Sequence, residues 1–187
     1  MFTTNQFSAH ELTIANEALL TKVANIEVLS SLSTQAQDPQ LQNILVQHTQ
    51  LIQQHYQQGI NLLQSLQIPV TVLDGALTGI QQGVRGVAST TQNLYAQAPS
   101  DRAISMVVLN LHKFGAIGWT TFALECINPQ LRSFFMNGAS LNDRMAYEVW
   151  GFMSQRGYYQ IPVPQTSMAA VTQSYPQIPV QGSVSYQ

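Results

Sequence analysis

Two short segments of the 187-residue sequence, 90 residues apart, share the pattern of a helix that begins directly after a tight turn. They read Asp38-Pro39-Gln40-Leu41-Gln42 and Asn128-Pro129-Gln130-Leu131-Arg132. Asp and Asn cap helix N-termini, and Pro is favoured in the first helical turn because its missing N–H leaves no donor unpaired there. Each segment lies between two stretches of helical periodicity, and Lys22 and Lys113 lie 17 and 16 residues before the two prolines. The sequence therefore predicts two αα-hairpins related by an internal duplication.

Apolar residues recur every three or four positions in four stretches, which is the spacing of amphipathic helices. These helices are expected over about residues 9–32, 39–66 and 101–125, and from 129 to just before Gly157. Ser8 and Glu11 form a predicted capping box at the start of the first helix. The predicted apolar stripes of the first and third helices include Leu12, Val107 and Phe114. Two such hairpins pack most simply as an all-α four-helix bundle, which makes residues 8–160 one domain.

The segment that joins the hairpins, residues 67–99, is too long for a plain loop in a compact domain. Helical apolar spacing continues in it after Asp74, and glycines recur every fourth position at Gly75, Gly79 and Gly83. One interpretation is a further helix of about 20 residues that runs ~30 Å along the bundle. Because each glycine costs a helix about 1 kcal/mol relative to alanine, the other interpretation is a partly frayed linker.

The last 28 residues, 160–187, differ in composition from the rest of the chain. They contain four prolines and no charged residue. Such a segment cannot hold a helix and has little apolar surface to bury, so we expect an extended or disordered tail rich in Pro, Gln and Tyr.

Charged residues are scarce throughout the sequence. Only 9% of residues are charged, the net charge is −2, and 25 residues are Gln. With two Lys and five Arg, all scattered, the chain lacks the basic clusters that nucleic-acid binding requires. Low charge also weakens repulsion between molecules, which favours association.

Other features of the sequence limit the compartment and the chemistry. No run of 18 apolar residues is present, so no membrane span is predicted, and residues 1–10 do not resemble a secretory signal. The single cysteine, Cys126, excludes an internal disulfide and a cysteine-based zinc site. We therefore expect synthesis in a cytoplasm, with Cys126 as a small buried side chain rather than a nucleophile.

A four-helix bundle raises the question of a metal-dependent oxidase, since di-iron bundles use Glu-x-x-His motifs. The sequence contains no such motif, although His48 and His55 lie on the inner stripe of the second helix. The inward-facing carboxylates are predicted to be Glu17 or Glu27, Glu125 and Glu148. We favour core histidines hydrogen-bonded across the bundle, with no catalytic, cofactor or metal site. The alternatives are a divergent metal-binding protein in which His48, His55, Glu17 and Glu148 meet, and a small-ligand-binding bundle with a cavity beside the crossover.

Aromatic residues and methionines crowd both faces of the fourth predicted helix. One face is expected to lie in the core and part of the other to contact a partner subunit. The predicted interaction residues are Trp150, Tyr158 and Tyr159, together with Tyr175 and Tyr186 in the tail.

The third and fourth predicted helices resemble the spore coat protein F (CotF-like) family. The resemblance covers about residues 100–160. It rests on a Lys-bearing helix, a turn of the form Asn/Asp-Pro-x-Leu-Arg, and a closing helix that ends in Met-x-x-x-Gly-Tyr-Tyr before proline. The matching residues are Lys113, Arg132, Met153, Gly157, Tyr158, Tyr159 and Pro162.

This resemblance implies a ferritin-like bundle that serves as a layer component of the bacterial endospore coat. It implies synthesis in the mother-cell cytoplasm, partners among other coat proteins and the chain itself, and no catalytic residues. Gln is also an acyl donor for transglutaminases and Tyr couples oxidatively. Gln160, Gln165, Tyr175 and Tyr186 are therefore candidates for crosslinking in a mature coat.

Overall fold

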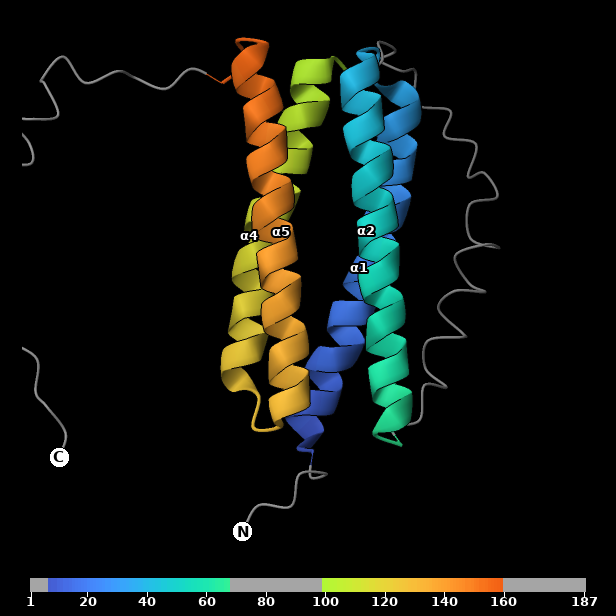
Figure 1. Cartoon of the computed structure of the whole chain (residues 1–187), viewed down its shortest axis with the longest axis vertical. Helices are drawn as coiled ribbons and strands as arrows, with labels where there is room; N and C mark the ends of the chain where they lie inside the picture. The colour runs from blue at the N-terminus through green and yellow to red at the C-terminus, as the bar shows by residue number, and fades with distance from the viewer. Residues whose placement is uncertain (1–6, 68–98, 160–187) are drawn as a thin grey trace, which may run out of the picture.

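The computed structural model describes residues 7–67 and 99–159, which form four long α-helices (Figure 1). The helices are α1 (Ala9–Gln35), α2 (Pro39–Ser65), α4 (Asp101–Glu125) and α5 (Pro129–Gln155). Helices α1 and α2 form one antiparallel hairpin, and α4 and α5 form the other (Figure 1). The hairpins meet through α2 against α5 and through α1 against α4. The predicted all-α four-helix bundle is confirmed, whereas the predictions for the crossover and the tail lie outside the described residues.

The helices begin where the capping residues predict. Ser8 and Glu11 form a complete capping box before α1, and Ser100 caps α4. Asp38 and Asn128 cap α2 and α5, each followed by proline in the first turn.

Helix α5 ends in a Schellman motif. Gly157 adopts φ +69°, a left-handed conformation that glycine tolerates without strain. This conformation lets the Tyr158 N–H donate to the Met153 carbonyl at 2.8 Å.

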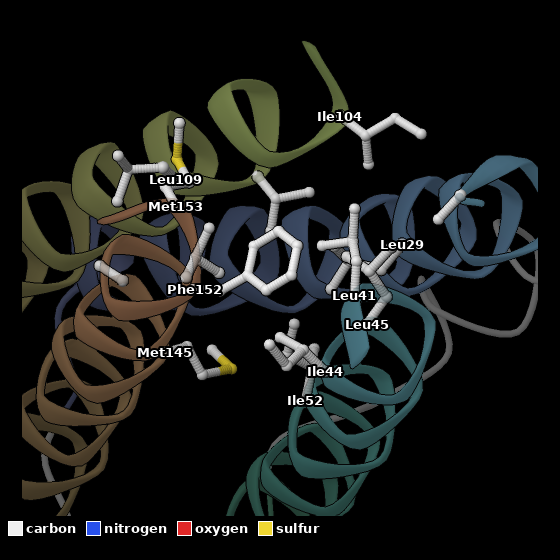
Figure 2. Close-up of a cluster of buried hydrophobic side chains, with 14 of the residues drawn as sticks. Leu29, Leu41, Ile44, Leu45, Ile52, Ile104, Leu109, Met145, Phe152 and Met153 are labelled. Atoms are coloured by element: carbon white, nitrogen blue, oxygen red, sulfur yellow. The ribbon is translucent and has the colours of Figure 1, made fainter. Parts of the chain in front are cut away.

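Two clusters of buried apolar side chains fill the bundle, one toward each end. The first cluster joins the end of α1 and the start of α2 to the start of α4 and the second half of α5 (Figure 2). The second cluster joins the opposite ends of the same helices and includes Trp119, Phe134 and Phe135. Gly138 is buried because Trp119 packs on it: a Cβ there would lie 2.2 Å from the indole ring.

The apolar stripes predicted for α1 and α4 include three residues that are exposed in the structure, so the prediction is wrong at these positions. Leu12 is 38% exposed, Val107 52% and Phe114 70%. The buried residues of α4 are instead Ile104, Ser105, Val108, Leu109, His112, Trp119 and Ala123. Because α4 is apolar around much of its circumference, the spacing of hydrophobic residues does not identify which face lies inside.

A carboxylate from each hairpin bridges the turn of the other hairpin. Glu11 of α1 accepts the N–H groups of Ile127 and Asn128, at 2.9 and 2.7 Å, in the turn between α4 and α5. Asp101 of α4 accepts the N–H groups of Gln37 and Asp38, at 2.8 and 3.0 Å, in the turn between α1 and α2. Burial by itself raises the pKa of Glu11, but hydrogen bonds from the Ser8 and Asn128 backbone hold it below its usual value.

These reciprocal contacts follow the internal repeat. Glu11 and Asp101 are 90 residues apart, and so are the Asp38 and Asn128 caps. The same offset aligns buried Lys22 with buried His112, whereas Lys113 is exposed. The sequence-based pairing of Lys22 with Lys113 is therefore off by one residue. The 90-residue offset relates equivalent tertiary contacts as well as similar sequence segments.

Replacing Glu11 with Ala should lower the free energy of unfolding by about 1–3 kcal/mol, because two backbone N–H groups at the far turn lose their acceptor. Asp101→Ala should lower it by a similar amount for the same reason. Urea denaturation followed by circular dichroism measures both effects. Glu17→Ala, at an exposed position of α1, is the control and should change stability by less than about 0.5 kcal/mol. Equal losses in all three variants would contradict the bridging role.

Candidate functional site

A layer of polar side chains lies in the core between the two apolar clusters. Each helix contributes to it: Lys22 from α1, His48 and His55 from α2, His112 from α4 and Asn142 from α5. All five are buried. Buried polar groups require partners, so the contacts of this layer determine what chemistry it supports.

A chain of hydrogen bonds crosses the layer from α4 to α5. His112 Nε2 lies 3.1 Å from His48 Nδ1, and His48 Nε2 lies 3.0 Å from the Glu148 carboxylate. Burial lowers the pKa of His48, although Glu148 opposes the shift. Burial and the charge of His48 lower the pKa of His112 to about 3.

Both rings are therefore neutral at neutral pH, and each carries one N–H. Since a carboxylate only accepts, His48 donates its Nε2 proton to Glu148 and accepts the Nε2 proton of His112. This assignment, inferred from the contacts, leaves His112 Nδ1 without a proton. A hydrogen bond with the Asn142 side chain also acts on the His112 ring and opposes the lowering of its pKa.

His55 lies among aromatic rings. Its ring stacks on Phe134 with centroids 4.5 Å apart and meets Trp119 edge-on at 5.3 Å. Both ring nitrogens are closed off from solvent, and a hydrogen bond with the Phe134 backbone opposes the lowering of the His55 pKa. Burial and the charge of Lys22 lower the pKa of His55 to about 3.

Lys22 is a buried ammonium group held by an aromatic face. Its Nζ lies 4.3 Å from the centre of the Trp119 ring. The ion pairs of the described residues do not include Lys22. Burial lowers its pKa to about 7. The layer therefore holds a titrating amine near neutral pH.

The four residues of the metal-binding alternative do not come together. Glu148 contacts His48. His55 lies two helical turns beyond His48 on α2, which places the two histidines about 10 Å apart along the helix axis. Glu17 is exposed, and so are Glu27, Glu125 and Glu148, which corrects their prediction as inward-facing carboxylates, although the Glu148 carboxylate still reaches His48. Across residues 7–67 and 99–159 no group of three or more His, Cys, Asp or Glu side chains is arranged to hold a metal ion. The residues present do not fit the dimetal site of a ferritin-like oxidase.

The structure adds two residues that the sequence analysis missed. Lys22 and His112 belong to the polar layer, but neither carries a motif of its own. The 90-residue repeat was the available signal, because it aligns these two positions. Cys126 is buried as predicted, and burial raises the pKa of its thiol to about 11.

The predicted interaction residues lie at one end of the bundle. Trp150, Tyr158 and Tyr159 are partly buried and pack on the first apolar cluster. Tyr147 is 71% exposed and stacks on Trp150, with ring centroids 5.4 Å apart. Tyr175 and Tyr186 lie outside the described residues.

The large exposed apolar side chains are concentrated on α4 rather than α5. We call Val107, Phe114, Ile117 and Leu124 the outer apolar row; they are 52–70% exposed. A groove of about 480 Å³ adjoins the row, between Ile117 and Thr121 of α4 and Met136 of α5. No helix in the described part of the chain is long and apolar enough to cross a membrane.

Comparison with known proteins finds a family match over the second hairpin. Residues 100–162 match the family model of the Coat F domain. A search of curated proteins finds no match.

Three solved structures resemble the whole bundle. A candidate spore coat protein of Bacillus halodurans C-125 is 16% identical, with a TM-score of 0.62 over 86% of this chain and 95% of that one. A two-domain protein of Anabaena variabilis ATCC 29413, with DJ-1/ThiJ/PfpI-like and ferritin-like domains, is 11% identical, with a TM-score of 0.63 over 87% of this chain and 41% of that one. A conserved hypothetical protein of Mycobacterium tuberculosis is 13% identical, with a TM-score of 0.58 over 79% of this chain and 99% of that one.

At these identities the structural likeness establishes the fold alone. The chain has the four-helix fold of ferritin-like structures, and its residues 100–162 match the Coat F domain.

Proposed function

We propose that this protein is a structural component of the bacterial endospore coat. In this proposal it is made in the mother-cell cytoplasm and acts by association with other coat proteins and with copies of itself, not by catalysis. The Coat F domain and the spore coat neighbour support the location. The outer apolar row on α4 supports the association.

The spacing of the outer apolar row favours a helical partner. Val107, Phe114, Ile117 and Leu124 follow one another at intervals of seven, three and seven residues. This is the a/d spacing with which one helix packs along another. A second α4 presents the same row, so two copies can bury the surface in a symmetric pair. The low charge of the chain leaves little repulsion to oppose the contact.

Replacing Phe114 and Ile117 together with Gln should shift the full-length protein toward monomer, because the middle of the row loses its apolar surface. Sedimentation velocity at several concentrations measures the shift. Val46→Gln, at a 44% exposed apolar position of α2, is the matched control and should leave the assembly unchanged. A wild-type protein that stays monomeric at high concentration would contradict self-association through this row.

The same variants test the role in the coat. Spores that carry the Phe114/Ile117 variant should retain less of this protein after mild detergent extraction than spores with the wild type or with Val46→Gln. Equal retention of all three would show that the outer apolar row does not anchor the protein in the coat.

A further inference from the structure

The exposed face of α4 has the same pattern when it is read in either direction. Asn110 and Thr121 fill the two seven-residue gaps of the outer apolar row, and both are exposed. The face is then apolar, polar, apolar, apolar, polar and apolar, at intervals of three, four, three, four and three residues. None of these positions is charged. A surface of this kind is complementary to a reversed copy of itself.

An antiparallel pair of α4 helices brings the whole face into register. When the two-fold axis passes between residues 115 and 116, residues equally distant from it lie opposite each other. Every apolar residue of the row then meets an apolar residue of the second copy, and each polar residue meets a polar one. The opposed pairs are Val107 with Leu124, Phe114 with Ile117, and Asn110 with Thr121.

The charges of the same helix disfavour a parallel pair. Arg102 and Lys113 are exposed on α4, and in a parallel pair each would lie level with its own copy. In the antiparallel register the two copies of Arg102 are 27 residues out of step, or about 40 Å along the axis, and those of Lys113 are five residues out of step, or about 7.5 Å. The helix dipoles are also opposed rather than aligned. The antiparallel pair therefore carries less repulsion.

Gly118 borders the row, four residues after Phe114 and three before Thr121. A Cβ at Gly118 would meet nothing within 4 Å, so packing inside the bundle does not require a glycine there. Glycine also destabilises a helix interior relative to alanine. In the antiparallel pair the Phe114 ring of the second copy lies over this position, and the missing side chain leaves room for it. The pair supplies a reason for Gly118 that the single bundle does not.

We infer that two copies of this protein associate through an antiparallel α4–α4 contact whose two-fold axis passes between residues 115 and 116. This inference rests on the proposed self-association through the outer apolar row and defines its direction and register. In each copy α5 ends beside the start of α4 (Figure 1). The two ends of α5, from which residues 160–187 continue, therefore lie at opposite ends of the pair. A pair built in this way can contact further coat proteins at both ends.

Cysteine crosslinking of the full-length protein tests the direction of the contact. Asn110→Cys and Thr121→Cys are mixed in equal amounts, left to exchange subunits and treated with oxidised glutathione, which is reduced as two thiols form a disulfide. A non-reducing gel should show at least about tenfold more linked dimer in the mixture than in either variant alone. Two copies of the same position lie 11 residues out of step, about 16 Å along the axis, which is too far for a disulfide. Wild type is the background control, because Cys126 is buried and the pKa of its thiol is raised to about 11.

A second pair of variants tests the close approach at Gly118. Gly118→Leu should weaken dimerisation at least about tenfold in sedimentation equilibrium, because the new side chain occupies the space of the Phe114 ring. Gly151→Leu is the matched control, since a Cβ at Gly151 on α5 also meets nothing within 4 Å, and it should dimerise as the wild type does. Equal dimer affinities of the two variants would contradict the register.

The crosslinking result separates this inference from the proposed function. Thr121→Cys that links alone as efficiently as the mixture would show a parallel pair, and self-association would stand while its direction was wrong. A dimer that is linked in neither the mixture nor the single variants would place the contact outside the row. A wild type that stays monomeric at high concentration would overturn the proposed self-association and this inference together.

Discussion

The free energy of unfolding should fall steeply as the pH drops from about 6.5 to 4.5, mainly because of His55 and His112. Each ring has an ordinary pKa of 6.5 and a pKa of about 3 in the folded protein. Above pH 6.5 the rings are neutral in both states and stability does not depend on them. Below pH 6.5 the unfolded chain takes up protons that the folded chain refuses, so stability decreases until about pH 3.

The size of this effect is large relative to the stability of a domain. Each ring loses on the order of 4 kcal/mol by pH 3, at 1.36 kcal/mol per pKa unit. A typical domain has about 5–15 kcal/mol in total, so the two rings together are sufficient to unfold the bundle in acid. Urea denaturation at a series of pH values measures the slope.

Two variants separate the buried histidines from other titrating groups. His55→Phe should reduce the slope by about one proton between pH 6.5 and 4.5, whereas Val46→Gln, at an exposed position without a titrating group, should keep the wild-type slope. The window stops at pH 4.5 because Glu11 and Asp38, whose pKa values are also lowered, contribute below it. A wild-type slope in His55→Phe would show that this ring protonates in the folded state.

The ends of the helices could be predicted from sequence because the signals there are local. A cap needs one side chain and the backbone two or three residues later, as at Asp38 and Asn128. The face of α4 could not be predicted in the same way. Its side chains are apolar on several sides, and packing against α5 and α1 decides which of them are buried.

The polar layer was predicted only where a polar residue interrupted a clear apolar stripe. His48 and His55 stand among Leu45, Ile52 and other apolar residues of α2, which marked them as inward-facing. Lys22 was missed because a lone lysine in a helix normally lies at the surface. Glu17 was assigned to the core wrongly because a shift of one residue turns a side chain by about 100° around the helix.

Contacts between residues far apart in the sequence could not be predicted from local sequence patterns. The bridge from Glu11 to Asn128 spans 117 residues, and the contact from His48 to Glu148 spans 100. Nothing in the sequence near Glu11 distinguishes its role in the first capping box from its role at the far turn. Only the 90-residue repeat carried information about this pairing, through the matching position of Asp101.

Replacing Lys22 with Met should stabilise the protein at pH 7 by about 2–4 kcal/mol. The pKa of Lys22 falls from 10.5 to about 7 on folding, which corresponds to a cost of on the order of 5 kcal/mol for burying the charge. Met keeps an unbranched apolar stem against Trp119 and removes the ammonium. Loss of the cation–π contact, worth about 0.5–2 kcal/mol, makes the net gain smaller than the full burial cost.

The pH dependence identifies the cause of this gain. Below pH 7 the amine is charged in both states, so the wild type carries the whole cost. Between pH 7 and 10.5 the folded protein releases the proton while the unfolded chain keeps it, so the stability of the wild type should rise with pH. Lys22→Met should lack this rise, and its advantage should therefore shrink toward pH 10 in urea denaturation. Lys113→Met, at an exposed site, should change stability by less than about 0.5 kcal/mol at either pH. A Lys22→Met protein less stable than the wild type at pH 7 would mean that the ammonium, and not its aliphatic stem, holds α1 against α4.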